Sequence, residues 1–277
     1  MAYCPIITII VPTKNSANTL PELILSLKQQ TSQEYEAIFV DYSSTDSTRS
    51  LLSAANIPRK IVDHDEPGIY QAINAGINKA TTDWIMVLGS DDQLASPHTI
   101  ARLREILSTV PISVAALYGT VRLASDGSLY NTAFSIIDHF TKSLCQQSIV
   151  YNRHCLLTMG LFPVTYRSSA DYVLNLQLLS RYGADSFFYI DEIIANYNDS
   201  GFSSYYVDYG YLRQSLYIRL ATLGKHVPLR HSIRAFIGRN GFVRYLLCRG
   251  YYNNIRILSI FAYICFQRTF KRFLLHP

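Results

Sequence analysis

The stretch Ile6-Ile7-Thr8-Ile9-Ile10-Val11-Pro12-Thr13-Lys14-Asn15 decides the fold of this chain. Its first six residues form a short apolar run that is typical of a buried strand, and a polar loop follows them. Thr19-Leu20-Pro21-Glu22 then matches a capping box, in which Thr and Glu side chains bond the free amides at the start of a helix. A strand that leads through a short loop into a helix is the first part of a β-α-β unit.

The same alternation of short apolar runs and helix-period segments continues along the first 110 residues. Further strands are expected at residues 35–41, 60–64, 84–88, 114–118 and 186–190, and further helices at 47–54, 69–80 and 171–182. In segment 69–80 one apolar stripe is formed by Ile69, Ala72, Ile73, Gly76, Ile77 and Ala80. Residues 119–150 lose the alternation, and we interpret them as a substrate-facing insertion. The pattern predicts an α/β protein, with a mostly parallel central sheet flanked by helices.

The charges are divided unevenly along the chain. Residues 1–208 contain 13 Lys and Arg against 20 Asp and Glu, whereas residues 209–277 contain 12 Lys and Arg and no acidic residue. We interpret 1–208 as a catalytic domain and 209–277 as a basic, aromatic-rich helical tail at an anionic membrane surface. The apolar run Ile257–Phe266 is about half as long as a spanning helix, so amphipathic interfacial helices are expected. The alternative is a basic helical subdomain packed on the body.

The cysteines indicate neither a disulfide framework nor a zinc site. The five of them are scattered, with no CxxC pair and no His at metal-ligand spacing, so a reducing compartment is expected. Met1 leads almost directly into the first strand, which leaves no room for a secretory signal. The sequence therefore predicts a cytoplasmic protein that is peripheral at the inner face of the cell membrane.

Polar loops follow the first, second and fourth predicted strands, at the edge where ligands bind in open parallel sheets. They are Pro12–Asn15, Asp41–Asp46 and Gly89–Asp92. The first loop has no glycine, so it lacks the phosphate-binding motifs of dinucleotide oxidoreductases and P-loop enzymes. The adjacent carboxylates Asp91 and Asp92 favour a divalent metal, Mn²⁺ or Mg²⁺, that bridges to diphosphate oxygens. Taken alone, Ser90-Asp91-Asp92 is equally compatible with a turn that caps the next helix.

Four ordered motifs resemble the family 2 glycosyltransferases, which have the GT-A fold. They are Val11–Asn15, Val40–Thr48, Gly68–Gly76 and Leu88–Asp92, and a fifth similarity covers residues 146–182. The resemblance implies an inverting, metal-dependent transferase that uses a nucleotide-diphosphate sugar, commonly in the synthesis of bacterial surface polysaccharide. A UDP-linked hexose or N-acetylhexosamine is the favoured donor, and a saccharide linked to polyprenyl diphosphate is the expected acceptor.

The resemblance also assigns donor-site roles. They fall on Pro12, Thr13, Asn15, Asp41, Tyr70, Asn74, Ser90 and Asp91. Asp41 would accept a hydrogen bond from the base, although its side chain also suits an Asx turn at the start of the Ser/Thr-rich loop. Tyr70 and Asn74 would border the donor, and the alternative for Asn74 is that it only ties a loop.

One position departs from the family. Gly89 stands where the family usually has Asp or Asn, so the first acid of the DxD motif is missing. Asp91 aligns with the last acid and is the expected metal ligand, with Asp92 as a second ligand or directly behind it. The metal would bind the diphosphate and stabilise the negative charge that develops on the departing nucleotide.

The fifth similarity implies that Asp171 is the base that removes the proton of the acceptor hydroxyl. Asp171 also has the context of a helix N-cap, which would hold its carboxylate rigidly. The family often has His where this chain has Gln146, and His139 is interpreted as a loop residue without a catalytic role. Because of Gly89, the alternative function is a non-catalytic, membrane-associated nucleotide-binding scaffold. Nucleic-acid binding is not expected, since the basic tail contains no nucleic-acid motif.

Overall fold

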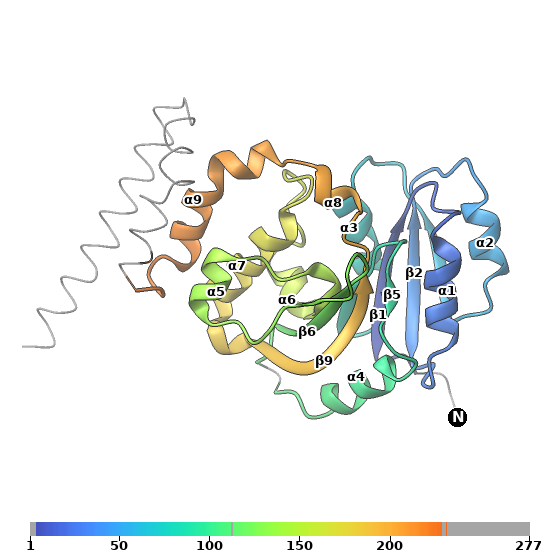
Figure 1. Cartoon of the computed structure of the whole chain (residues 1–277), viewed down its shortest axis with the longest axis horizontal. Helices are drawn as coiled ribbons and strands as arrows, with labels where there is room; N and C mark the ends of the chain where they lie inside the picture. Colours follow the sequence, from blue (N-terminus) through green and yellow to red (C-terminus); the bar gives the residue numbers. More distant parts are fainter. Residues whose placement is uncertain (1–3, 112, 229–230, 232–277) are drawn as a thin grey trace, which may run out of the picture.

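A mixed β-sheet forms the centre of the protein in the computed structural model, which describes residues 4–111, 113–228 and 231. Its strands are β1 (Ile7–Thr13), β2 (Tyr35–Asp41), β3 (Arg59–Asp63), β4 (Trp84–Val87), β5 (Gln93–Leu94), β6 (Ala116–Leu123), β7 (Leu129–Tyr130), β8 (Ile149–Asn152) and β9 (Phe187–Tyr197). They follow the order β3-β2-β1-β4-β8-β6-β9-β5, with β7 paired to β6. The first four strands are parallel, and β8 and β5 run against their neighbours. The predicted α/β architecture is confirmed (Figure 1).

The strand order reverses at β1. From β1 the chain moves outward to β2 and β3, and it then returns to place β4 on the other side of β1. Connections leave in opposite directions at such a point, which opens a crevice beyond the carboxyl ends of the strands. The loops after β1, β2 and β4 all begin at this carboxyl edge of the sheet. The topology therefore brings the three predicted polar loops together.

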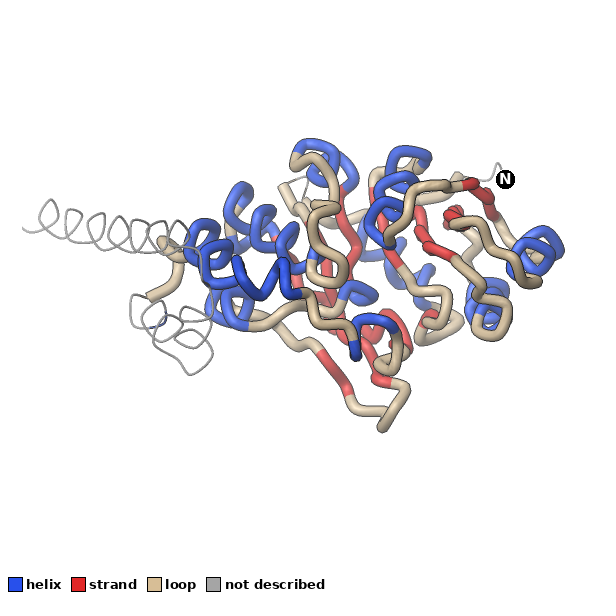
Figure 2. Tube along the Cα trace, turned by 90° about the horizontal axis from the view of Figure 1, so that it is seen from above, coloured by secondary structure: helices blue, strands red, loops and turns tan. Residues whose placement is uncertain are grey.

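Helices cover both faces of the sheet (Figures 1 and 2). They are α1 (Leu20–Lys28), α2 (Thr48–Ala54), α3 (Ile69–Lys79), α4 (Thr99–Leu107), α5 (Ile136–Thr141), α6 (Arg153–Thr158), α7 (Ala170–Tyr182), α8 (Phe202–Tyr205) and α9 (Tyr209–Leu223), with 3-10 turns η1 (Gln146–Ser148) and η2 (Ala184–Ser186). Side chains of β1 alternate between two cores: Ile7, Ile9 and Val11 pack in the core of α1, and Ile10 in that of α3. A Cβ at Gly76 of α3 would lie 2.6 Å from Cγ2 of Ile10, so this close approach of helix and sheet needs glycine.

The first turn of helix α1 is capped differently from the prediction. The side chain of Thr19 makes no capping bond, and its Oγ1 donates instead to the backbone oxygen of Ser16 at 3.4 Å. That oxygen also accepts the amide of Leu20 at 2.9 Å, so a preceding turn supplies the first acceptor. The predicted capping box is therefore wrong here. A capping box does occur at α5, where Ser135 and Asp138 exchange both bonds.

Two further sequence expectations need correction. Ile69 is 44% exposed and does not belong to the buried stripe of α3, because it is the first residue of the helix and faces outward. The rest of the stripe is buried as predicted. Residues 119–150 keep more regular structure than their pattern indicates, since they include most of β6, β7, α5 and η1.

Helix α9 connects the beginning of the basic tail to the body. Oδ2 of Asp208 accepts the backbone amides of Arg167 and Ser168 at 2.7 and 3.1 Å, and its Oδ1 caps α9 by accepting the amide of Tyr211. Within the part of the chain that the structure describes, no helix combines the length and apolar character needed to cross a membrane. The interfacial helices predicted around Ile257–Phe266 lie outside the described residues.

Candidate active site

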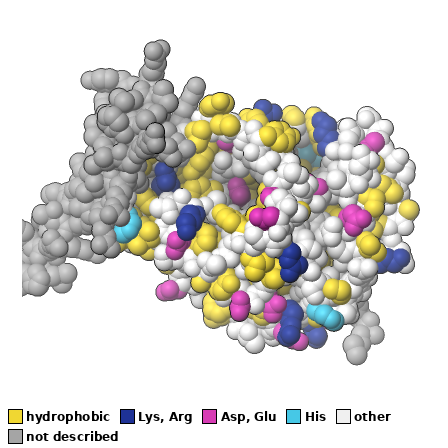
Figure 3. All heavy atoms as spheres, in the orientation of Figure 1, with side chains coloured by type: hydrophobic (Ala, Val, Ile, Leu, Met, Phe, Trp, Pro, Cys, Tyr) yellow, Lys and Arg dark blue, Asp and Glu magenta, His cyan; other side chains and the backbone are white. Residues whose placement is uncertain are grey.

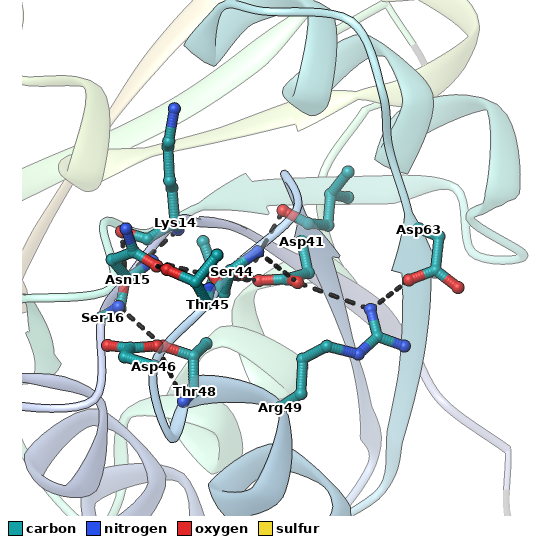
Figure 4. Close-up of polar contacts among 12 residues, drawn as sticks. Lys14, Asn15, Ser16, Asp41, Ser44, Thr45, Asp46, Thr48, Arg49 and Asp63 are labelled. Atoms are coloured by element: carbon teal, nitrogen blue, oxygen red, sulfur yellow. Dashed lines mark hydrogen bonds and ion pairs between the residues drawn. The ribbon is translucent and has the colours of Figure 1, made fainter.

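Asp41 is a buried carboxylate at the end of β2, and both of its oxygens are bonded (Figure 4). Oδ1 accepts the hydroxyls of Ser44 and Thr13 at 2.6 and 3.2 Å. Oδ2 accepts the amide of Ser44 at 3.2 Å and lies 3.4 Å from a guanidinium nitrogen of Arg49, which also pairs with Asp63 of β3. Asp41 therefore does begin a side-chain turn, and it joins the end of β1 to the loop after β2.

Asn15 joins the same two loops from the side of β1. Its side-chain oxygen accepts the backbone amide of Thr45 at 2.8 Å, and its backbone amide donates to the hydroxyl of Ser44 at 2.8 Å. Asn15 and Ser43 have positive φ angles of 49° and 47°. Left-handed backbone at non-glycine residues is costly and gathers at functional sites. With Pro12 leading into it from β1, this pair of loops forms one rigid structure at the carboxyl edge.

Asp91 and Asp92 follow β4, and their carboxylates have different surroundings. Asp92 is 1% exposed, and its oxygens accept the backbone amides of Gly89 and Asn198 at 2.8 and 2.9 Å. Burial raises the pKa of Asp92 to about 6, and the nearby Asp91 adds to the effect. Asp91 is half-buried, like Ser90 before it, and accepts the side-chain amide of Asn198 at 3.0 Å. Asp91 is therefore the carboxylate that can meet a ligand, while Asp92 fixes the loop.

Gly89 leaves the space into which the two carboxylates turn. A Cβ at this position would lie 2.6 Å from Oδ1 of Asp91 and 2.7 Å from Oδ2 of Asp92. Among the described residues, no cluster of three or more His, Cys, Asp and Glu side chains could hold a metal ion. The residues present fit a cation that takes one carboxylate from the protein and its other ligands from diphosphate and water, as Mg²⁺ commonly does.

Asp171 lies in the first turn of α7, two residues after the N-cap residue Ser169, so it is not itself the cap. Its Oδ1 accepts the hydroxyl of Tyr70 at 3.0 Å. Burial raises the pKa of Asp171 to about 6, and the hydrogen bond from Tyr70 opposes this rise. A carboxylate that titrates near neutral pH suits a general base, because it is ionised yet still binds a proton appreciably.

Tyr70 and Asn74 lie one turn apart on α3, which begins just beyond the carboxyl end of β3. Tyr70 bonds Asp171, and the side chain of Asn74 bonds both backbone groups of Phe162, at 2.9 and 3.0 Å. Asp171 and Asp92 both act electrostatically on Cys145, so Asp171 lies close to the loop after β4. Figure 3 shows acidic side chains near the middle of the visible face of the molecule. Direct contacts of Tyr70 and Asn74 with a donor stay a prediction.

Three side chains of the site were not found by sequence reasoning. Asn198 follows β9 and contacts both Asp91 and Asp92, and Gln147 adds a side-chain hydrogen bond to Asp92. Arg49 reaches Asp41 from α2. All three come from distant segments that only the fold brings together. The turn-forming run Asn198–Gly201 was the one available signal, but the strand before it was predicted only to residue 190, whereas β9 continues to Tyr197.

The reversed strand order and the carboxylate loop after β4 fit a nucleotide-sugar transferase of the GT-A type. The family model of glycosyl transferase family 2 matches residues 8–161. The chain belongs to this family, and the family expected from the sequence is confirmed.

Comparisons with individual proteins agree with this assignment. A PGL/p-HBAD biosynthesis glycosyltransferase of Mycobacterium tuberculosis is 32% identical over 217 residues, which cover 76% of this chain and 84% of the relative. The structure of S. aureus TarS 1-349 with UDP-GlcNAc has a TM-score of 0.66 at 16% identity, and covers 94% of this chain and 80% of that one. Mannosyltransferase PcManGT from Pyrobaculum calidifontis, solved with GDP-Man and Mn²⁺, has a TM-score of 0.54 at 18% identity, covering 95% and 76%. The two structures confirm the fold.

Proposed function

We propose that this protein transfers one hexosyl or N-acetylhexosaminyl residue from a nucleotide-diphosphate sugar, preferably UDP-linked, to a saccharide acceptor with inversion at the anomeric carbon. The observation that carries the proposal is that Asp41 and Asp91 lie at the carboxyl edge of the sheet, with Asp171 close to the loop that carries Asp91. Asp41 organises the loops for a nucleotide, Asp91 is available to a cation, and Asp171 is a half-buried base. Each of them serves a different part of a transfer from a nucleotide sugar.

The base of the donor would bind where the loops after β1 and β2 meet, beside Asn15. The longest contact of Asp41 is the one between its Oδ2 and Arg49, at 3.4 Å. A base N–H group can replace Arg49 at this oxygen, because the guanidinium stays paired with Asp63. A carboxylate only accepts hydrogen bonds when ionised, so it selects a base with an N–H donor, such as uracil.

Asp91 would hold Mn²⁺ or Mg²⁺ together with the donor diphosphate, with Ser90 beside it and Asp92 behind it. In the ion pairs among described residues Asp91 has no partner, so its charge is available. The presence of Mn²⁺ in the PcManGT structure also supports a cation here. When bound, such a cation supplies positive charge next to the departing diphosphate.

Asp171 would accept the proton of the acceptor hydroxyl during the transfer. As that oxygen bonds to the anomeric carbon, the bond from this carbon to the diphosphate oxygen breaks on the opposite face. The nucleotide diphosphate leaves with the bonding electrons, and the proton stays on Asp171. Attack opposite the leaving group inverts the configuration, and one base is sufficient for it.

The acceptor would be a lipid-linked saccharide at the inner face of the cell membrane, in the synthesis of a bacterial surface glycoconjugate. The mycobacterial relative is a glycosyltransferase of PGL/p-HBAD biosynthesis, which supports this class of product. The 12 Lys and Arg of residues 209–277 support attachment to an anionic membrane surface. Residues 1–208 would then be the catalytic domain and 209–277 the membrane-associated tail of a cytoplasmic protein.

A thermal-shift panel tests the proposal. The full chain is mixed with UDP-, GDP-, CMP- and dTDP-linked sugars, each with Mn²⁺ or with EDTA, and its melting temperature is measured. Sugar transfer or donor hydrolysis is then measured with each donor that stabilises the protein. We expect one nucleotide class to raise the melting temperature in a metal-dependent way. Asp91→Ala should abolish the shift and the turnover. Asp83→Ala is the matched control, because Asp83 is an exposed carboxylate before the amino end of β4.

Two outcomes would contradict the transferase. No shift with any donor would contradict the binding of a nucleotide sugar, and a shift without transfer or hydrolysis would favour the non-catalytic nucleotide-binding scaffold. Full activity of Asp91→Ala would remove the metal assignment. Flotation of the full chain with anionic and neutral liposomes tests the membrane surface separately, and oligonucleotide gel shift is its control for nucleic-acid binding.

A further inference from the structure

Asp171 has a specific hydrogen-bond donor, and it comes from a helix on the donor side of the site. The hydroxyl of Tyr70, the second residue of α3, donates to Oδ1 of Asp171 at 3.0 Å. Tyr70 is only 7% exposed, and this bond spans 101 positions of sequence. A buried phenol that donates to a carboxylate fixes the orientation of that carboxylate, here together with the backbone amides of Asp171 and Tyr172.

The ring of Tyr70 is itself held in place. It stacks on the ring of Phe162 with centroids 5.7 Å apart and planes at 17°. Phe162 is 1% exposed, and the buried Tyr151 meets its ring edge-on at 5.9 Å. A buried aromatic ring that stacks on such a fixed neighbour has few rotamers available, so the direction of the Tyr70 hydroxyl is set by this packing.

Asn74 fixes the other side of the stack. It lies one helical turn after Tyr70, on the same face of α3. Its Nδ2 donates to the backbone oxygen of Phe162 at 2.9 Å, and its Oδ1 accepts the amide of Phe162 at 3.0 Å. The residue before Phe162, Leu161, has a positive φ of 69°. Such strained backbone persists only where its surroundings hold it, and the two bonds from Asn74 do so.

We propose that Tyr70 is a positioning residue that orients the carboxylate of the catalytic base, Asp171, toward the acceptor. Asn74 holds Phe162 in place, and the ring of Phe162 in turn holds the ring of Tyr70. The inference rests on the proposed function, because it takes Asp171 as the base. It gives Tyr70 and Asn74 a role on the acceptor side, beyond any contact they make with the donor. Helix α3 thereby connects the donor-side edge to the base.

The charge state of Asp171 also depends on Tyr70. The titratable groups that face Asp171 are Tyr70 from α3, Tyr151 from β8 and Cys145 just before η1. In the ion pairs among described residues, Asp171 has no cationic partner. Tyr70 is thus the side chain that stabilises the ionised carboxylate by donation, and its loss should raise the pKa of Asp171.

The test compares Tyr70→Phe with Tyr35→Phe in the full chain. Tyr35 is also buried and donates to a backbone oxygen, that of Leu27, but it lies at the opposite end of the sheet. We expect Tyr70→Phe to lower kcat about ten-fold or more. The donor KM and the size of the donor-induced shift in melting temperature should stay within about two-fold of the wild-type values. The acidic limb of the kcat/KM profile should move to higher pH. Asn74→Ala should lower kcat in the same direction, and Tyr35→Phe should change none of these values.

A second measurement is independent of turnover. The carboxyl carbon of Asp171, assigned by comparison with Asp171→Asn, is followed by ¹³C NMR through a pH titration of the wild-type protein and Tyr70→Phe. A higher pKa in Tyr70→Phe supports the contact. An unchanged pKa, a kcat equal to that of Tyr35→Phe, or a raised donor KM with normal kcat overturns the positioning role. Normal activity of Asp171→Asn instead shows that the proposed base is wrong, which separates the two failures.

Discussion

Asp171 sets the pH range in which the proposed reaction can run. Its pKa is raised to about 6 by burial, which the bond from Tyr70 partly opposes. A base acts only when ionised, so log kcat/KM should rise with pH below about 6 and level off above it. Asp92 has a similarly raised pKa, and its ionisation can steepen the same limb. Steady-state rates between pH 5 and 8 measure the profile.

The control for this profile is Asp171→Asn, which keeps the shape of the side chain but binds no proton. It should lower kcat by about 100-fold or more, and the rise of log kcat/KM with pH that is due to the ionisation of Asp171 should be absent. A wild-type profile that is flat from pH 5 to 8 would show that no group of this pKa acts as the base.

Asn198 should strengthen cation binding without being a carboxylate. Its side-chain amide holds Oδ2 of Asp91 at 3.0 Å, and its backbone amide holds Asp92 at 2.9 Å. Asn198→Ala leaves the Asp91 carboxylate free to rotate, so we expect the affinity for Mn²⁺ in the presence of UDP to fall about ten-fold. Calorimetry measures it. Asn196→Ala is the control, because Asn196 lies on β9 and its side chain accepts a hydrogen bond from Arg122 of β6. Equal affinities in the two variants would contradict the role of Asn198.

Candidate site residues could be selected from the sequence where their type and position in the chain repeat a family motif. Asp41 and Asp91 lie at the carboxyl ends of strands and Asp171 lies in the first turn of a helix, as the motifs indicated, and their catalytic roles stay predictions. The partners that tune them were not predictable, since Asn198 is 107 positions from Asp91. The direction of a side chain could not be predicted either, because the sequence alone does not show that Asp92 points inward to the backbone amides of Gly89 and Asn198.

At the scale of elements, β1, β2 and α3 were predicted closely because their apolar spacing is strong. The start of α1 was predicted correctly, with Thr19 at the N-cap position, but the predicted capping box was wrong, since a local turn at Ser16 competes with the side chain of Thr19 for the same role. Segment 119–150 was interpreted as irregular because its elements are short. The exposed hairpin strand β7 has two residues and α5 has six, too few to show a period.

Glu36 ties together the four parallel strands at their amino ends. Its Oε1 accepts the hydroxyls of Thr8 and Thr81 and the amide of Thr81, each at 2.8 Å, and its Oε2 pairs with Lys60 at 2.7 Å. Burial tends to raise the pKa of Glu36, but the bonds from Lys60, Thr81 and Thr8 outweigh it and leave the pKa lowered. The stabilisation is therefore present above the ordinary pKa and is lost as pH falls through the lowered one.

Glu36→Gln should lower the free energy of unfolding at pH 7 by about 1–3 kcal/mol, because an amide cannot accept all of these bonds. Urea denaturation followed by circular dichroism measures it. Glu22→Gln is the control, since Glu22 is exposed on α1. If both variants unfold at the same urea concentration, Glu36 does not link the strands.

At the scale of the whole molecule, a cluster of aromatic rings joins α5 to strands β6 and β9. His139 of α5 is 4% exposed and contacts the rings of Tyr118, Phe134 and Phe187 at 5.3 to 5.9 Å. The rings come from β6, from β9 and from the segment before α5, so the cluster packs this helix against the sheet. The sequence interpretation of His139 as a loop residue is wrong, although the structure likewise gives it no contact with the predicted site.

The buried His139 makes the fold sensitive to acid. Burial lowers its pKa to about 4, against a smaller opposing effect of Asp138, while the unfolded chain has a value near 6.5. The folded state is therefore fully favoured above about pH 6.5, and it loses up to about 3 kcal/mol as the pH falls to 4. Asp92 and Asp171, whose pKa values are raised, oppose this loss between pH 6 and 4.

His139→Phe isolates the contribution of the imidazole, because it keeps an aromatic ring in the cluster but binds no proton. Relative to its own stability at pH 7.5, the variant should lose less unfolding free energy than the wild-type protein when the pH is lowered to 4.5, by about 2–3 kcal/mol. Urea denaturation at several pH values measures both slopes, and the comparison is unaffected by any packing cost of the larger ring. His154→Gln is the control, because His154 is exposed on α6 and its removal should leave the pH dependence unchanged. Parallel curves for His139→Phe and the wild-type protein would mean that His139 becomes protonated within the fold at no cost.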